Sequence, residues 1–414
     1  MAVLQPVRGT RDILPEESRR HRFIVDTARA TAMRYGYDEV ATPIFEFSDV
    51  FRRTLGDTSD IVTKEMYSFT DKGGDEITLR PEGTAGVARM LISGGQAKDL
   101  PLKYFYHGPM FRYERPQKGR FRQFHQIGIE LLGVAGTAGD VEVIALGADT
   151  LESLGVLGRT SLELNTLGNA ASRAAYRDVL VAYLDGHRDR LSADSRARLE
   201  RNPLRVLDSK DRGDKAVVAD APDFGDYLDS ESSDFFAAVR AGLDALAIAY
   251  VLNPRLVRGL DYYHHTAFEF TTEALGAQGT VLAGGRYDGL VSQMGGPATP
   301  GVGVAAGIER LAMLVEGVPQ PVRPISVVPV GPESETAALT LTQRLRAGGF
   351  TVDLGYRGNI GRRLKRANKL NACVAVIVGP DELARDAVML RDLDSGEQTE
   401  VPLAEIDHKL APYR

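Results

Sequence analysis

The sequence has one cysteine and no tryptophan among its 414 residues. A single cysteine excludes an internal disulfide and a zinc site built from cysteines, and Cys373 stands in the apolar run ACVAVIV, which is typical of a buried strand. No apolar run is long enough to cross a membrane, and the first residues lack the apolar core of a signal peptide. We therefore expect a cytoplasmic protein with no membrane partner.

The sequence also lacks an excess of positive charge and a phosphate-binding GxxxxGK[ST] loop. The formal net charge is −6, so any nucleic acid must be held by local basic patches rather than by the overall field. The remaining composition is that of an ordinary globular protein, and the length allows two or three domains.

A long hairpin is predicted at the centre of the chain, with strands over 104–112 and 121–130 and a polar loop over 113–120. Side chains alternate across a strand, so each face of the second strand has its own set. One face carries Arg122, Phe124, Gln126, Gly128 and Glu130; the other carries Gln123, His125, Ile127 and Ile129. The first set has a ring, an amide, a carboxylate and a gap at Gly128, which together describe the floor of a pocket.

The loop of this hairpin is basic. Arg112 ends the first strand, and the loop adds Arg115, Lys118 and Arg120 against one acid, Glu114. Guanidinium groups grip phosphate or carboxylate oxygens two at a time, so we expect an anionic ligand above the hairpin. A solvated basic loop is the alternative for the loop alone, but it gives no reason for Gln126 and Glu130 to stand behind Phe124.

The run FRYERPQKGRFRQFHQ resembles motif 2 of the class II aminoacyl-tRNA synthetases, in the form found in the histidyl-tRNA synthetase family. Other stretches are similar to the same family: residues 36–56 to motif 1, which supports a dimer interface, RPEGT at 80–84, RGLDYY at 258–263, and residues 284–314 to motif 3. The resemblance implies a homodimeric ligase that activates histidine with ATP and transfers it to tRNA(His).

The implied fold is an α+β catalytic domain on a mixed, mainly antiparallel sheet, over residues 1–320, with a helical insertion at about 170–250. A proline-rich linker, VEGVPQPVRP, ends this domain. Strands and helices alternate beyond it, which predicts a small α/β domain over 325–414. The family uses this domain to bind the anticodon, and the insertion reaches towards the acceptor arm of the tRNA.

The resemblance also implies roles for individual residues. Arg258 and Arg112 are the expected catalytic residues. Histidine is expected to contact Glu82, Thr84, Gln126, Glu130, Arg258, Tyr262, Tyr263 and Tyr287. ATP is expected to contact Arg112, Arg120, Phe124 and Arg310, and tRNA to contact Arg115, Lys118, Arg362, Arg363 and Arg366. Magnesium is expected to arrive with ATP, and no zinc, NAD or metal cluster of protein side chains is expected.

Two smaller predictions concern Thr84 and the strand that follows residue 261. Thr84 stands at a strand-to-helix junction, where it could also serve as an N-cap. The strand after the turn at 258–261 is predicted to place Tyr262 and Tyr263 on opposite faces, as it does His264 and His265, which makes the two histidines a poor metal pair.

Two other functions compete with the synthetase. A synthetase-like regulatory subunit of ATP phosphoribosyltransferase would bind histidine without catalysis. Two features count against it: the arginine-containing motif 2 and RGLDYY stretches are both complete, and a complete last domain follows the linker. The glycines at 301–307 imitate a dinucleotide-binding fingerprint, a weak match because no apolar strand precedes them and no βαβ unit surrounds them.

Overall fold

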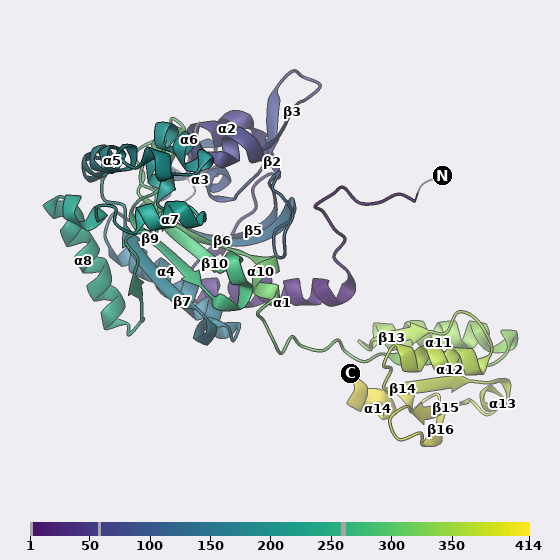
Figure 1. The fold of residues 1–414 in the computed structure, drawn as a ribbon. Helices are drawn as coiled ribbons and strands as arrows, with labels where there is room; N and C mark the ends of the chain where they lie inside the picture. The colour runs from purple at the N-terminus through teal and green to yellow at the C-terminus, as the bar shows by residue number, and fades with distance from the viewer. Residues whose placement is uncertain (1–2, 57–58, 258–261) are drawn as a thin grey trace. The chain divides into compact units, whose positions relative to one another are not determined.

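The computed structural model describes residues 3–56, 59–257 and 262–414, and the chain divides into two compact units, Met1–Val318 and Pro319–Arg414. Figure 1 shows the ribbon of both units. Arg258 and its neighbours at 259–261 lie outside the described residues.

An eight-stranded sheet forms the centre of the first unit. Its strands, in spatial order, are β1 (Asp38–Glu39), β5 (Leu102–Phe111), β6 (Gln123–Leu132), β11 (Gly301–Gly307), β10 (Thr280–Arg286), β9 (His264–Thr271), β7 (Ser161–Thr166) and β8 (Val251–Leu252). The pairs β1–β5 and β7–β8 are parallel, and the others are antiparallel. The strands β5 and β6 are adjacent and antiparallel, so they form the predicted hairpin.

Each face of this sheet is covered by its own apolar cluster. Ile127 and Ile129 of β6 pack with α1 (Pro15–Arg34), α4 (Ala138–Ser153), α8 (Ser230–Ala245) and α10 (Ile308–Ala312). Tyr106 and Ala267 face the other side, with α2 (Ser48–Leu55), α3 (Thr84–Ser93) and α9 (Leu290–Gln293). Figure 1 shows α2 and α3 on one side of the sheet and α1 on the other. The period-2 pattern of β6 therefore separates a core face from a site face.

Residues 170–245 of the first unit are mainly helical, with α5 (Ala170–Asp185), α6 (Ala193–Arg201) and α7 (Arg212–Val218) preceding α8. All four helices follow a polar residue whose side chain accepts a hydrogen bond from the first turn: Asn169, Ser192, Asp211 and Asp229. Such N-caps satisfy backbone N–H groups that a helix start leaves without partners. Local sequence thus fixes where each helix of the insertion begins.

A second sheet of the first unit has the order β2 (Phe45–Phe47), β4 (Glu76–Leu79) and β3 (Tyr67–Thr70), all antiparallel. A π-helix, Ile61–Glu65, precedes β3. The inner face of this small sheet buries Glu46 and Thr78, whereas Phe45, Phe47 and Phe69 are about half exposed on the outer face, at 56%, 60% and 48%. Its outer face is therefore unusually apolar.

The second unit contains a five-stranded sheet. The order is β13 (Val352–Leu354), β12 (Ile325–Pro329), β14 (Val374–Val378), β15 (Ala387–Asp392) and β16 (Gln398–Pro402), with β13, β12 and β14 parallel. Four α-helices accompany it: α11 (Glu335–Ala347), α12 (Ile360–Lys369), α13 (Pro380–Leu383) and α14 (Ile406–Leu410). Every residue of β12 and β14 is buried, as expected for parallel strands that are covered on both faces.

Candidate active site

Glu130 is the centre of the site, near the end of β6, and only 1% of its surface is exposed. Its Oε1 accepts hydrogen bonds from Oγ1 of Thr84 at 2.7 Å and from the hydroxyl of Tyr106 at 3.3 Å. Its Oε2 accepts a hydrogen bond from the hydroxyl of Tyr287. Three hydroxyl donors from three separate elements thus hold one carboxylate.

Burial dominates the ionisation of Glu130 and raises its pKa to about 8. The hydrogen bonds from Tyr287 and Thr84 favour the charged form and oppose this shift, while the nearby Glu82 adds to it. Glu130 is therefore poised to change its charge near neutral pH, which is characteristic of residues in functional sites.

Glu82 lies at the junction between β4 and α3, where its carboxylate accepts the backbone N–H groups of Thr84 at 2.6 Å and Ala85 at 2.9 Å. Burial raises the pKa of Glu82, and these two amide hydrogen bonds act against the rise. The carboxylate of Glu82 caps α3, so the alternative of Thr84 as the N-cap is wrong. The hydroxyl of Thr84 is free to serve Glu130 instead.

The gap expected at Gly128 is filled by Tyr106, the residue opposite it on β5. A Cβ atom at Gly128 would lie 2.1 Å from Cζ of the Tyr106 ring. The prediction of an empty space was therefore wrong: the glycine lets Tyr106 lie flat across β6 and reach Glu130. Sequence reasoning missed Tyr106, and only the strand register identifies it.

Two glycines of β11 make similar room on the other side of Glu130. A Cβ atom at Gly303 would lie 1.9 Å from Oε2 of Glu130, and one at Gly301 would lie 2.3 Å from the ring of Tyr287. Because β11 is antiparallel between β6 and β10, it belongs to no βαβ unit and the dinucleotide-binding alternative is wrong. These glycines accommodate site side chains.

Three tyrosine rings lie together beside Glu130. The ring centres of Tyr262 and Tyr263 are 4.6 Å apart, and that of Tyr287 lies 5.7 Å from Tyr262. The prediction that Tyr262 and Tyr263 lie on opposite faces was wrong, because β9 begins only at His264 and the alternation of a strand does not extend back to them. Both tyrosines are buried in the cluster on the site face.

Gln126 stands between Glu130 and Phe124 on the same face of β6, as predicted. Its Oε1 is buried and has no hydrogen-bond partner among the described residues. A buried acceptor without a partner costs free energy, which a bound ligand with a donor would recover.

Three arginines gather at the open end of the hairpin. The Nε group of Arg112 donates to the backbone carbonyl of Pro81 at 2.8 Å, and its guanidinium lies 5.5 Å from the centre of the Phe124 ring. Glu114 lies between Arg112 and Arg120, with N···O distances of 3.9 and 2.9 Å. Glu114 thus orders two guanidinium groups beside an aromatic ring.

Arg310 joins this group from α10, where it donates to the carbonyl of Thr280 at 2.6 Å. Burial lowers the pKa of Arg310, and the charges of Arg120 and Arg112 act in the same direction. The three guanidinium groups therefore repel one another, and the acids Glu114 and Glu269 oppose this repulsion. An anion of more than one charge would relieve it.

The residues predicted to contact tRNA differ in exposure. Arg115 and Lys118 are exposed on the hairpin loop, and Arg362 and Arg366 are exposed on α12, where Arg366 pairs with Asp353 at 2.9 Å. Arg363, by contrast, is 6% exposed. It donates to the carbonyl of Pro329 and, at 3.1 Å, to Glu335. Its guanidinium holds α12 on the sheet, so a tRNA contact at Arg363 is contradicted by its burial.

An antiparallel sheet with arginines on its central hairpin and on the helix after a glycine-rich strand defines the catalytic domain of a class II aminoacyl-tRNA synthetase. Comparison with known proteins agrees: the family described as histidyl-tRNA synthetase matches residues 9–311, and the anticodon binding domain matches residues 325–411. The chain belongs to the histidyl-tRNA synthetase family.

The relatives support the same family over the whole chain. The histidine–tRNA ligase of Rhodospirillum rubrum is 62% identical over 417 residues, and that of Gluconacetobacter diazotrophicus is 57% identical over 411; the matches cover 100% and 99% of each chain. The crystal structure of apo Staphylococcus aureus histidyl-tRNA synthetase has a TM-score of 0.81 at 34% identity and covers 98% of this chain and 99% of its own. The predicted family, fold class and enzyme class are confirmed.

Proposed function

We propose that this chain activates histidine with ATP to give histidyl-adenylate and pyrophosphate, and then transfers histidine to the 3′ end of tRNA(His). The observation that carries the proposal is the pairing of two environments on one face of β6: a buried hydroxyl-bound carboxylate at Glu130 and a cluster of arginines beside Phe124. One environment suits an imidazole, and the other suits a triphosphate.

The first step brings two anions together, because the attacking carboxylate of histidine is already ionised at neutral pH. No catalytic base is required, and the site must instead supply fixed positive charge and orientation. Arg112, Arg120 and Arg310 supply the charge, and Phe124 offers its ring to adenine. Mg²⁺ arrives with ATP and neutralises part of the phosphate charge.

Arg258 is proposed as a second catalytic arginine that contacts both the α-phosphate and the carboxylate of histidine. It lies outside the described residues, so its support is the match of RGLDYY to the family. The described neighbours Tyr262 and Tyr263 are packed against Tyr287 beside Glu130.

Histidine recognition is proposed to rest on hydrogen bonds. A neutral imidazole has one N–H donor and one acceptor nitrogen, and a carboxyl group together with a tyrosine hydroxyl can form a hydrogen bond with each of them. Glu130 and Tyr263 take this role. The amino and carboxylate ends of the substrate then meet Glu82, Thr84, Gln126 and Tyr287. A site of this kind rejects analogues without the matching groups by roughly 10⁴–10⁵.

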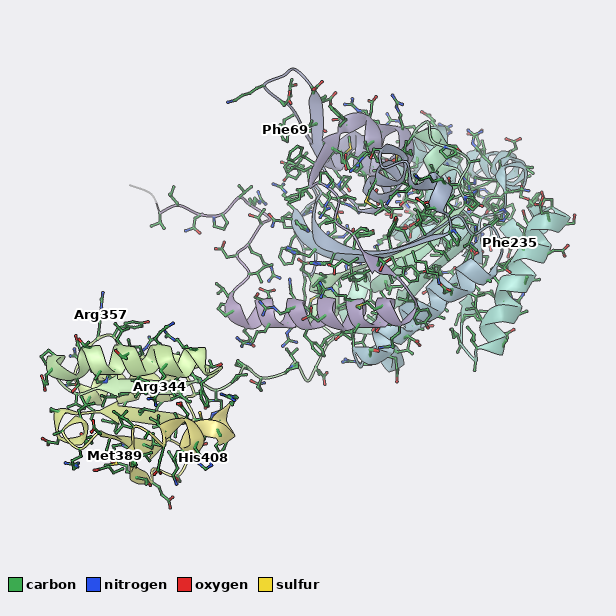
Figure 2. All side chains as sticks on the ribbon, turned by 180° about the vertical axis from the view of Figure 1, so that it is seen from behind. Phe69, Phe235, Arg344, Arg357, Met389 and His408 are labelled. Atoms are coloured by element: carbon green, nitrogen blue, oxygen red, sulfur yellow. The ribbon has the colours of Figure 1, made fainter. Side chains whose placement is uncertain are left out.

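The second unit is proposed to bind the anticodon arm of the tRNA. Arg357, Arg362, Lys365 and Lys369 are exposed on or beside α12 and can contact phosphates. Figure 2 shows Arg357 projecting from this unit. Arg115 and Lys118 on the hairpin loop are proposed to meet the acceptor end. A tRNA partner also favours a cytoplasmic location. Among the described helices, none has the length and apolar character of a membrane span.

A second copy of the chain is proposed to cover the outer face of the small sheet. Phe47, Ile77 and Phe69 are cross-strand neighbours on this face, and Phe45 extends it. Figure 2 shows Phe69 on the hairpin that extends from the first unit. Exposed aromatic side chains in one patch are typical of protein interfaces. The segment that resembles motif 1, which supports the dimer of the class, includes Phe45 and Phe47.

Histidine-dependent exchange of pyrophosphate into ATP tests the activation step. The wild type should show it, and Arg112→Ala should lower its rate by about 10²–10³ because a preorganised donor is lost. Arg188→Ala, which removes an exposed arginine of the helical insertion, is the control. A protein that binds histidine but exchanges no pyrophosphate would favour the regulatory-subunit alternative. One structural neighbour, from Bacillus halodurans, carries both names, but at 23% identity it shows the fold alone.

A further inference from the structure

Three ionisable side chains from separate elements meet on the face of the sheet opposite the proposed substrates. They are His21 of α1, His125 of β6 and Glu309 of α10, and their nitrogen and oxygen atoms lie within 4.8 Å of one another. The proposed reaction uses none of them directly. Glu309 is 6% exposed and His21 is 8% exposed, so the group is largely buried.

Both carboxylate oxygens of Glu309 contact a single residue, His125. Its two oxygens lie 3.1 and 3.0 Å from the backbone nitrogen of His125, and Oε1 also lies 2.8 Å from Nδ1 of the ring. The ladder between β6 and β11 ends where Gly307 faces Gln126, so the next N–H group of β6 has no strand partner. The carboxylate of Glu309 takes the place of that partner and extends the attachment of β6 by one residue.

This contact joins the two elements that carry the ATP-binding side chains. His125 is adjacent in sequence to Phe124, and Glu309 is adjacent to Arg310. We propose that Glu309 is a positioning residue for ATP, because it ties the strand that presents the adenine-stacking ring to the helix that presents a phosphate-binding guanidinium. The inference rests on the proposed function, since it takes Phe124 and Arg310 as ATP contacts.

The geometry favours a structural link over a metal site. Nδ1 of His125 is already at hydrogen-bond distance from Glu309, and His21 contributes an edge-on ring contact with His125, with ring centres 5.7 Å apart. Burial lowers the pKa of His21, which favours the neutral imidazole. His21 packs against the link and keeps the ring of His125 in place.

The test is a kinetic comparison of variants in histidine-dependent pyrophosphate exchange. Glu309→Ala should raise the KM for ATP about tenfold and leave the KM for histidine within twofold, because the two ATP elements lose their fixed separation while Glu130 and its hydroxyls stay in place. Glu309→Gln should recover much of the loss, since its amide oxygen still accepts the backbone N–H. His125→Ala keeps that N–H and should show a smaller effect than Glu309→Ala. Glu316→Gln, at an exposed carboxylate in the same unit, is the control.

Several results would overturn the inference. One is an unchanged KM for ATP in a folded Glu309→Ala protein, and another is an equal rise of both KM values. If Glu309→Ala fails to fold, Glu309→Gln and His125→Ala carry the same comparison. Zinc that is retained by the wild type after dialysis against EDTA and lost in His21→Ala would make the group a metal site instead. If the wild type exchanges no pyrophosphate, the proposed function fails, and ATP affinity measured by calorimetry still reports on Glu309.

Discussion

The hydroxyl of Tyr287 donates a hydrogen bond to Oε2 of Glu130, although Tyr287 directly follows β10 and β11 lies between β10 and β6. Gly301 and Gly303 of β11 leave the space through which the two side chains meet. The contact connects the residue after β10 to β6, so the glycine-rich strand β11 is packed between two side chains of the candidate site.

The pH dependence of stability should reveal the burial of Glu130. Its pKa of about 8 in the folded protein is above the ordinary value of 4.5, so folding favours the protonated form. The contribution of protonated Glu130 to the free energy of unfolding is complete below pH 4.5. It is lost as the pH rises to 8, by up to about 1.4 kcal/mol per pH unit. Chemical denaturation between pH 5 and 9 should show a smaller fall for Glu130→Gln than for the wild type. Equal slopes for both proteins would contradict the assignment.

Gly303→Ala should disturb histidine binding and also strain the contact between β11 and β6. Its Cβ atom would meet Oε2 of Glu130 at 1.9 Å and the carbonyl of Ile129 at 2.7 Å, so the carboxylate must leave Tyr287. We expect the KM for histidine in pyrophosphate exchange to rise at least about tenfold, because a buried polar pair worth 1–3 kcal/mol is broken. Gly158→Ala, which meets no atom within 4 Å, is the matched control. Wild-type histidine kinetics in Gly303→Ala would disprove the close approach.

Neighbouring arginines of α12 should separate stability from tRNA binding. Arg363→Ala removes a buried guanidinium that holds Pro329 and Glu335, and should lower the stability of the second unit by about 1–3 kcal/mol. Arg362→Ala removes an exposed charge and should leave the melting temperature unchanged while it weakens tRNA binding, more so at low salt. Thermal unfolding and filter binding of tRNA measure the two effects. A loss of stability in Arg362→Ala but not in Arg363→Ala would reverse their roles.

The site face of β6 was predictable because a long strand fixes the direction of every side chain by its period of two. Phe124, Gln126 and Glu130 follow from that rule alone. Tyr106 does not, because its approach to Gly128 depends on the register between two strands, which local sequence leaves open. Tyr262 and Tyr263 were misplaced because the first residue of a strand is poorly marked in sequence.

The position of Arg363 shows a different limit. The buried residues of α12 are Arg363 and Ala367, which are four positions apart and so share one face of the helix. That spacing was available in the sequence, but a run of basic residues conceals which of them points inward. An arginine usually stays at the surface, and only its partners Pro329 and Glu335 reveal that this one is part of the packing.

The outer face of the small sheet should control dimer formation. Phe47→Asp combined with Phe69→Asp places two charges in the apolar patch, where a partner would have to desolvate them. Sedimentation of the wild type should give a dimer, and the double variant should give monomers at micromolar concentration. Leu339→Asp makes the same kind of change at an exposed apolar residue of the second unit and serves as the control. An unaltered dimer in the double variant would place the interface elsewhere.

Cutting the chain near Pro321 should divide the two steps of the reaction. The contacts that hold the end of the first unit lie before the cut: Arg20 donates to the carbonyl of Val315 at 2.7 Å, and Arg159 pairs with Glu316 at 3.0 Å. Residues 1–320 should therefore fold and retain pyrophosphate exchange, since every proposed contact with histidine and ATP lies within them. Charging of tRNA should fall far more than exchange, because the anticodon contacts are lost while the acceptor end still reaches the site. Circular dichroism verifies the fold of the shortened protein. An equal loss of both activities in a folded fragment would show that the second unit supports activation itself, and its proposed role in tRNA binding would have to be replaced.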